Sequence, residues 1–155
     1  MNRTVWMDRG INSDPIAAST DHYLYSQETG FDDGSTTPVT AISAHIESSQ
    51  IDMGDGDHFT FINKMIPDIT FRDSTALSPS ATMTLQARNY PGGVYLQTQE
   101  KSVTRTSTVP IEQWTNEVNL RLRGRAFSLK LESTGTGTAW RLGTPRVDLR
   151  PDGRR

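Results

Sequence analysis

Acidic side chains in glycine-rich segments are the first residues of this sequence that could do chemistry. The segment IDMGDGDH carries aspartates at positions 52, 55 and 57, and carboxylate oxygens spaced along a glycine-rich loop are ligands that Ca²⁺ prefers. The segment lacks the regular spacing and the distal bidentate glutamate of an EF-hand loop. We therefore interpret it as a turn between strands, and we expect no metal site.

The other reactive residue types form no recognisable catalytic motif. The histidines at positions 22, 45 and 58 are scattered, and none has a metal-ligand spacing such as HExxH. The sequence has no GxSxG elbow, no phosphate-binding P-loop motif and no cysteine, which excludes thiolate nucleophiles and disulfides. A pair of glycosidase carboxylates stays open, because their separation is spatial rather than sequential. We predict no enzyme, no catalytic residue and no cofactor.

Charge is distributed unevenly along the chain. Residues 1–75 carry four Lys or Arg against twelve Asp or Glu, whereas residues 121–155 carry nine against three. This split has two interpretations that both stay open: pairing between strands of one fold, or docking of an acidic face on a basic face of another copy. On the second interpretation, the candidate assembly or partner contacts are Arg121, Arg123, Arg146, Arg150, Arg154, Arg155, Asp32 and Asp33.

The segment that begins at Glu117 predicts the strands that position these arginines. Apolar and polar residues alternate from 118 to 123, which is the period expected for a strand with one packed face. After Gly124 the apolar residues move to the odd positions 127, 129 and 131. One extra residue exchanges the two faces of a strand, so we predict a β-bulge or a tight turn at positions 123–125. A last strand is expected at the C-terminus, with the charges of 146, 148 and 150 on its open face.

The middle of the chain also favours strands. Segments rich in Thr, Val, Ile and aromatic residues lie between Gly, Pro and Asp turns, at 39–47, 59–66, 69–71, 82–88, 93–97 and 101–108. The only segment with some helical character, Ile111–Asn116, is too short to be convincing. Short strands separated by turns predict an all-β fold, an antiparallel β-sandwich of about seven to nine strands.

The first 38 residues differ from the remainder. They lack sustained periodicity and contain several turn sequences, so we predict an irregular N-terminal arm at 1–38 and a β-sandwich domain at 39–155. A length of 155 residues suits one domain with a real core. There is no apolar run long enough to span a membrane and no secretion leader, so we expect a soluble protein made in a cytoplasm.

Several motifs resemble those of structural proteins from tailed bacteriophages. They are HYLYSQETGFDDGST, HIESSQIDMGDGDHFTFINKMIPDITF, LQARNYPGG, LRLRGRAFSLKLES and WRLGTPRVDLRPDGRR. From about Tyr23 to Arg155 the chain is similar to the C-terminal portion of the tail nozzle or tail tubular proteins of short-tailed phages, which overlap with packaged-DNA stabilisation proteins. Those proteins are usually several times longer, so this chain would be a detached domain, the product of a split gene or a smaller relative.

The resemblance implies a virion protein, made in the host bacterium, that is present in several copies around the tail axis and helps to retain and deliver the genome. Its partners would be copies of itself and other phage tail proteins, with no membrane and no small-molecule substrate. A basic stripe can contact DNA phosphates without reading sequence, so only non-specific proximity to DNA is expected. Two alternatives stay open: a carbohydrate-binding β-sandwich that recognises a host glycan, and a hydrolase of surface polysaccharide.

Overall fold

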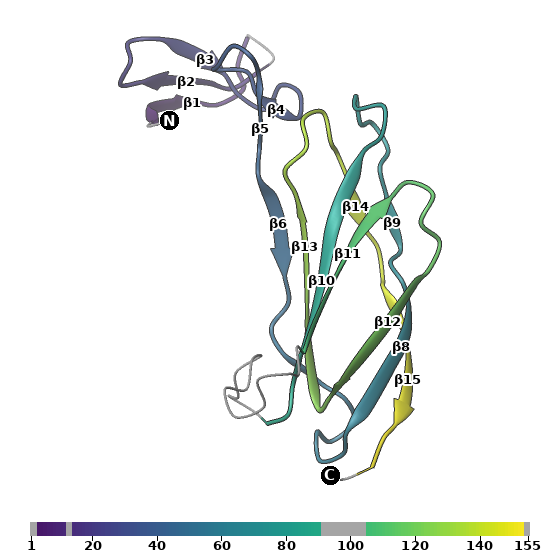
Figure 1. Cartoon of the computed structure of the whole chain (residues 1–155). Helices are drawn as coiled ribbons and strands as arrows, with labels where there is room; N and C mark the ends of the chain where they lie inside the picture. The colour runs from purple at the N-terminus through teal and green to yellow at the C-terminus, as the bar shows by residue number, and fades with distance from the viewer. Residues whose placement is uncertain (1–2, 12–13, 91–104, 154–155) are drawn as a thin grey trace.

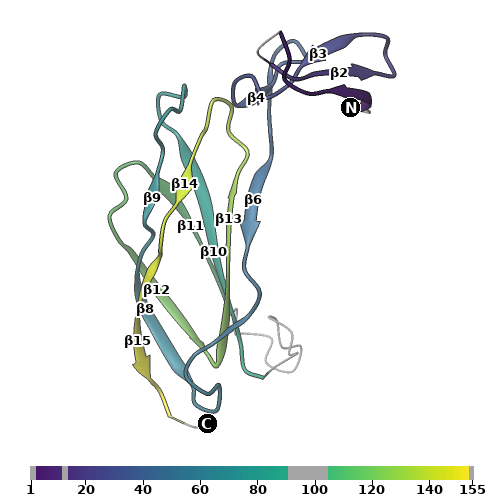
Figure 2. The same cartoon turned by 180° about the vertical axis from the view of Figure 1, so that it is seen from behind.

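The described residues of the chain form strands and their connections. The structure is a computed structural model that describes residues 3–11, 14–90 and 105–153. Within these ranges there are fifteen strands and no helix, and the sheets are antiparallel, which confirms the predicted all-β, sandwich-like class. No helix among these residues could therefore cross a membrane. Figures 1 and 2 show an elongated body of two facing layers, with a small sheet at one end.

The larger layer of the body is an antiparallel sheet with the strand order β11-β10-β13-β6. Its strands are β6 (Ala44–Glu47), β10 (Ser80–Arg88), β11 (Thr106–Glu112) and β13 (Ala126–Ser133), and the short β7 (Ile51–Asp52) also pairs with β13. Every second residue of β10 from Ala81 to Ala87 is buried. This alternation is the pattern of a strand with one face against a core.

The second layer is the three-stranded sheet β12-β8-β15. The central strand β8 (Thr60–Ile66) lies between β12 (Val118–Gly124) and β15 (Arg146–Pro151). Both pairings of β8 shift register along their length. The shifts are bulges, and they allow Ile62 and Met65, three positions apart, to be buried together.

The two layers enclose the hydrophobic core of the body. Met83, Ile111 and Leu131 of the larger sheet are 0% exposed, and Ile62 and Met65 of the second sheet are 1% exposed. Complete burial of a side chain of this size contributes about 1.5–3 kcal/mol. The core therefore holds the sheets face to face and leaves the outer faces open to solvent or to a partner.

The connection between β12 and β13 carries the chain from one sheet to the other. β12 belongs to the three-stranded sheet and β13 to the larger one, with a single bend at Arg125 between them. The predicted exchange of faces is thus a tight bend, and it occurs because both strands turn their apolar side toward the same core. Gly124 is required here, since a Cβ atom would lie 2.9 Å from Ala87 Cβ and 3.0 Å from the Arg88 carbonyl oxygen.

Some strand predictions differ from the structure at their ends. The predicted strand at 93–97 and the first part of the one at 101–108 lie outside the described residues. β11 continues to Glu112, so Ile111 belongs to a strand and not to a helical segment. Beside the main layers, β9 (Ile69–Thr70) pairs with β14 (Arg141–Leu142).

Residues 1–38, which we call the arm, contain a small sheet of their own. Its order is β1-β2-β3, with β1 (Arg3–Met7), β2 (Ile16–Ser19) and β3 (Leu24–Ser26), and the arm then continues through β4 (Asp32–Asp33), which pairs with β5 (Thr40–Ala41). The small sheet lies past one end of the body, opposite the end that carries β15 (Figures 1 and 2). The irregular sequence of the arm does not predict these short strands, and the boundary at residue 38 stays a prediction.

Candidate functional site

Four arginines predicted as partner contacts lie on one surface, the outer face of the sheet β12-β8-β15. Arg123, Phe61 and Arg150 are cross-strand neighbours, so their side chains share a face. Arg121 and Arg146 have the same parity as these arginines in their strands, and both are exposed. We call this surface the basic face and define it by Arg121, Arg123, Arg146, Arg150 and Phe61.

Not every arginine of the basic face forms an ion pair with another described residue. Arg150 Nη2 lies 3.7 Å from Asp148 Oδ2 in the same strand. In the part of the chain that the structure describes, no carboxylate forms an ion pair with Arg121 or Arg146. Exposed pairs contribute only about 0–1 kcal/mol, whereas a guanidinium can bind a carboxylate or a phosphate through two parallel hydrogen bonds. The face is therefore suited to an acidic partner.

Arg123 is held in place by its neighbours. Its Nε contacts the Asp152 carboxylate, and its Nη2 donates to the Asp152 carbonyl oxygen at 3.1 Å. The guanidinium carbon also lies 4.0 Å from the centre of the Phe59 ring, and that of Arg125 lies 4.7 Å from the same ring. Cation–π contacts of this kind contribute about 0.5–2 kcal/mol. Arg123 thus links β12 to the residue that follows β15, and it also lies on the basic face.

Two arginines that the sequence analysis did not single out contact the backbone of Arg123 and Arg125. Arg105 is 8% exposed and donates from Nη1 to the Arg123 carbonyl oxygen at 3.0 Å. The carbonyl oxygen of Arg88 accepts a hydrogen bond from the Arg125 N–H at 2.8 Å. The pairing of β10 with β13 brings Arg88 close to Arg125, whereas Arg105 is held beside β10 by the Ala87 N–H, which donates to the Arg105 carbonyl oxygen at 2.8 Å. No local sequence pattern could have found these contacts.

The arm presents an exposed apolar surface. Cross-strand register places Val5 beside Ala18 and Leu24, and it places Met7 beside Ile16. The exposed fraction is 64% for Val5, 57% for Met7 and 74% for Leu24. We call these five residues the apolar arm face. Contiguous apolar surface that stays in water commonly marks a contact with another protein.

The opposite side of the arm sheet carries Trp6, which lies beside Ala17 and is 52% exposed, together with charged and aromatic side chains. The Arg3 guanidinium carbon lies 4.5 Å from the centre of the Tyr25 ring, and Ala17 and Ser19 in β2 are buried. The Tyr25 hydroxyl donates to Asp21 Oδ2 at 2.7 Å. This hydrogen bond lowers the pKa of Asp21 and raises the pKa of Tyr25.

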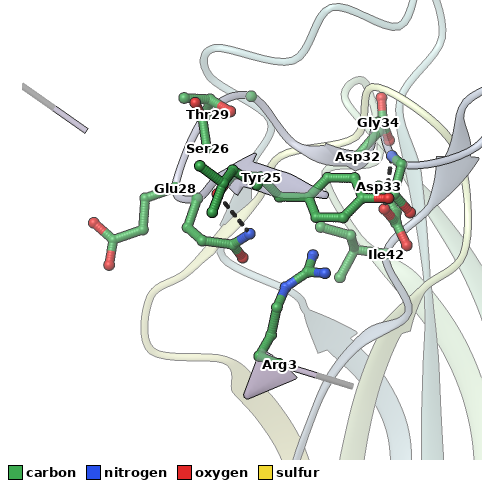
Figure 3. A pocket seen from close by; sticks show the side chains of 13 residues that line it. Arg3, Tyr25, Ser26, Glu28, Thr29, Asp32, Asp33, Gly34 and Ile42 are labelled. Atoms are coloured by element: carbon green, nitrogen blue, oxygen red, sulfur yellow. Dashed lines mark hydrogen bonds between the residues drawn. The ribbon is translucent and has the colours of Figure 1, made fainter. Parts of the chain in front are cut away.

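A pocket of about 510 Å³ opens beside Tyr25, and its lining includes Arg3, Leu24, Tyr25, Glu28 and Asp33. In Figure 3 the Arg3 guanidinium points toward the Tyr25 ring, whereas the Glu28 carboxylate points away from it. The Ser35 hydroxyl and backbone N–H lower the pKa of Asp33, and the N–H donates to Asp33 Oδ1 at 3.0 Å. An aromatic ring among charged groups is an arrangement that can hold a small polar ligand.

The two predicted acidic contacts lie apart from the basic face. Asp32 accepts hydrogen bonds from the Gly137 N–H, with both carboxylate oxygens 2.8 Å from the nitrogen. Gly137 lies between β13 and β14, so this contact ties the arm to the body. Asp33 lines the pocket in the arm, and Arg154 and Arg155 lie outside the described residues.

The aspartate-rich segment at 52–58 has the contacts of a turn. The Gly56 N–H donates to the Met53 carbonyl oxygen at 3.3 Å, and His58 Nδ1 contacts Asp57 Oδ1. Across residues 3–11, 14–90 and 105–153, no group of three or more His, Asp or Glu side chains is placed to hold a metal ion. This segment therefore offers no argument for a metal centre.

Two surfaces thus stand out, the basic face on the sheet β12-β8-β15 and the apolar arm face on the sheet β1-β2-β3. These two sheets lie toward opposite ends of the molecule (Figures 1 and 2). Both are built on strands, and both present exposed side chains of types that are enriched in protein contacts. A search of protein-family models found no match to this chain, and a search of curated proteins found none either.

Proposed function

We propose that this chain is a structural component of a bacteriophage tail, of the nozzle or tail-tube type, that forms or joins a ring around the DNA exit path. There it helps to retain the packaged genome and to deliver it. The resemblance of its motifs to phage tail proteins supports the phage assignment. The observation that carries the structural role is the apolar arm face, which a single copy leaves in water.

The physics of a small sheet links this observation to assembly. A sheet of this size needs packing on an apolar face to be stable. The arm sheet buries only small side chains, such as Ala17 and Ser19, whereas its larger apolar residues are exposed. Each Å² of apolar surface removed from water contributes about 25 cal/mol. A neighbouring subunit that covers the apolar arm face therefore stabilises the arm and the assembly together, as in closed symmetric oligomers.

Self-association of the purified chain tests the structural role. Sedimentation velocity at increasing protein concentration should show larger species, and electron microscopy of those species should show closed rings. If assembly requires another tail component, purified particles that lack this chain should bind the added chain, and a pull-down of the particles should recover it. A strict monomer that binds no other virion protein would contradict the structural role.

Location tests the phage assignment separately. Particles produced in the presence of an epitope-tagged chain should carry the tag, and gold-labelled antibody should mark the tail and not the capsid. Label elsewhere on the particle, or particles without the chain, would contradict the assignment even if the purified chain assembles.

A second candidate function is the recognition of a host surface glycan, and the pocket beside Tyr25 favours it. An aromatic ring with nearby charged and polar groups gives a sugar both an apolar platform and hydrogen-bond partners. A glycan array should then give a signal with the natural chain and none with a Tyr25→Ala variant. An array without signal would remove this alternative and leave the structural role unaffected.

A further inference from the structure

Building on the structural role proposed above, we propose that the arm of one copy docks on the basic face of the next copy. The apolar arm face and the basic face then cover each other, and the occupant of both surfaces is a second copy of this chain.

Charge complementarity is the first support for this contact. Residues 1–38 carry two arginines against six Asp or Glu. Four of these carboxylates contact Tyr25, Arg9, Gly137 or Ser35, whereas Asp8 follows Met7 and Asp14 lies two residues before Ile16, at one end of the apolar arm face. The basic face presents Arg121 and Arg146 without ion pairs to described residues, together with Arg150 at its exposed edge. Surfaces of opposite charge attract one another and fix the orientation in which two proteins meet.

Apolar residues among the charges are the second support. On the basic face, Phe61 lies between Arg123 and Arg150 in the cross-strand register. Ile66, which is 40% exposed, lies opposite Arg146. Packing of these two side chains on the apolar arm face gives an interface with an apolar centre and a charged rim, which is the usual anatomy of a protein contact.

The shape of the molecule excludes the same contact within one copy. The hydrogen bonds between Asp32 and Gly137 hold the arm near one end of the body, whereas β15 lies at the other end (Figures 1 and 2). A contact between two arms would place two acidic segments together, which like-charge repulsion disfavours. A contact between two different surfaces is heterologous, and it closes into a ring when the rotation between copies permits.

Disulfide trapping tests this docking directly, because the chain has no cysteine of its own. A double variant, Leu24→Cys with Ile66→Cys, places one thiol in the apolar arm face and one beside the basic face. After mild oxidation we expect the monomer band on a non-reducing gel to be replaced by a ladder of covalent oligomers, because each copy links to the next. The two single variants should remain monomeric on the same gel. Covalent dimers from Leu24→Cys alone would overturn the proposal, because they report contact between two arms.

A matched control separates docking from random collision. Leu77 is 100% exposed and belongs to neither surface, so Leu24→Cys with Leu77→Cys should give no ladder, and an equal ladder would overturn the proposal. Replacement of Arg146 and Arg150 by Glu should abolish self-association in sedimentation velocity while the circular dichroism spectrum stays unchanged. If the natural chain never self-associates or joins a tail component, the proposed function fails. If it assembles without the 24–66 ladder, only the docking fails.

Discussion

The body and the arm of this chain are built from the same kind of strand, but only the body covers its apolar side chains. In the body, Met83 and Leu131 are 0% exposed between two sheets, whereas in the arm Val5 is 64% and Leu24 is 74% exposed. A sheet becomes stable when a second layer covers its apolar face. The body contains both layers, and the arm contains one. The body is therefore expected to be stable alone, and the arm is expected to depend on a partner.

The two regions also differ in how they contribute to the core. Among the described residues, the hydrophobic core cluster draws its members from position 53 onward. The arm is joined to the body through β5 and through the hydrogen bonds of Asp32 with Gly137. Regions with little buried apolar contact open locally at low cost. Changes in the arm should consequently affect assembly, and changes in the body should affect folding.

The largest effect is expected from a deletion in the body core. Leu131→Ala removes a fully buried side chain, so the free energy of unfolding should fall by about 2–5 kcal/mol. Urea denaturation followed by circular dichroism measures this change. The matched control is Leu77→Ala at a fully exposed position, where a change within about 0.5 kcal/mol is expected. Equal effects at the two positions would contradict a core between the sheets.

A smaller loss is expected where the chain crosses between the sheets. Gly124→Ala places a Cβ atom 2.9 Å from Ala87 Cβ, and such overpacking costs about 1–3 kcal/mol. Gly34→Ala in the arm is the matched control, because a Cβ there meets nothing within 4 Å. The same denaturation measurement should show a loss only for Gly124→Ala. A neutral result would mean that the crossing adjusts to accept a methyl group.

A change in the apolar arm face should separate assembly from folding. Val5→Ser combined with Leu24→Ser leaves the body core intact, so the unfolding transition of the body should shift by no more than about 0.5 kcal/mol. Self-association should weaken, because the exposed apolar area that a partner would cover is reduced. Sedimentation velocity and urea denaturation of the same sample measure both quantities. A loss of body stability without a change in association would contradict the conclusion that the arm serves assembly and the body serves folding.

The strands of the body could be predicted because their side-chain pattern is local. The alternation at Val118, Leu120 and Leu122 has the period of a half-buried strand, and all three residues are buried. The exchange of apolar faces after Gly124 indicated a bend, and the bend is present. The sequence could not show that the bend leads into another sheet, because strand pairing depends on partners far away in the chain.

The candidate surfaces could be predicted only in part, for the same reason. The alternation of β12 and β15 placed the arginines on open strand faces, but only the position of β8 between these strands unites them with Phe61. Arg88 and Arg105 reach the backbone of Arg125 and Arg123 through contacts between residues far apart in the chain. The strands of the arm are short and contain small residues such as Ala17 and Ala18, so their periodicity is too weak to read.

The smallest expected effect concerns a carboxylate of the arm. The Ser35 hydroxyl and N–H lower the pKa of Asp33, and a group with a lowered pKa in the folded state stabilises that state above its ordinary pKa. The contribution is lost as the pH falls through the lowered value. Ser35→Ala removes the hydroxyl, so the pKa of Asp33 should rise toward its ordinary range, as measured by NMR titration of the carboxyl carbon.

Ser80→Ala in the body is the control for this titration, because Ser80 is exposed in β10 and should leave the pKa of Asp33 unchanged. An unchanged pKa in Ser35→Ala would show that the N–H alone is responsible. Because the core cluster begins at position 53, the acid unfolding of the body should be the same in both variants. As the pH falls, the amides of β4 should instead lose their protection from exchange at a higher pH in Ser35→Ala than in the natural chain. The reason is that a carboxylate with a higher pKa is protonated at a higher pH. If the amides of β10 lost protection at the same pH, arm and body would open together, which would contradict the independence inferred from their packing.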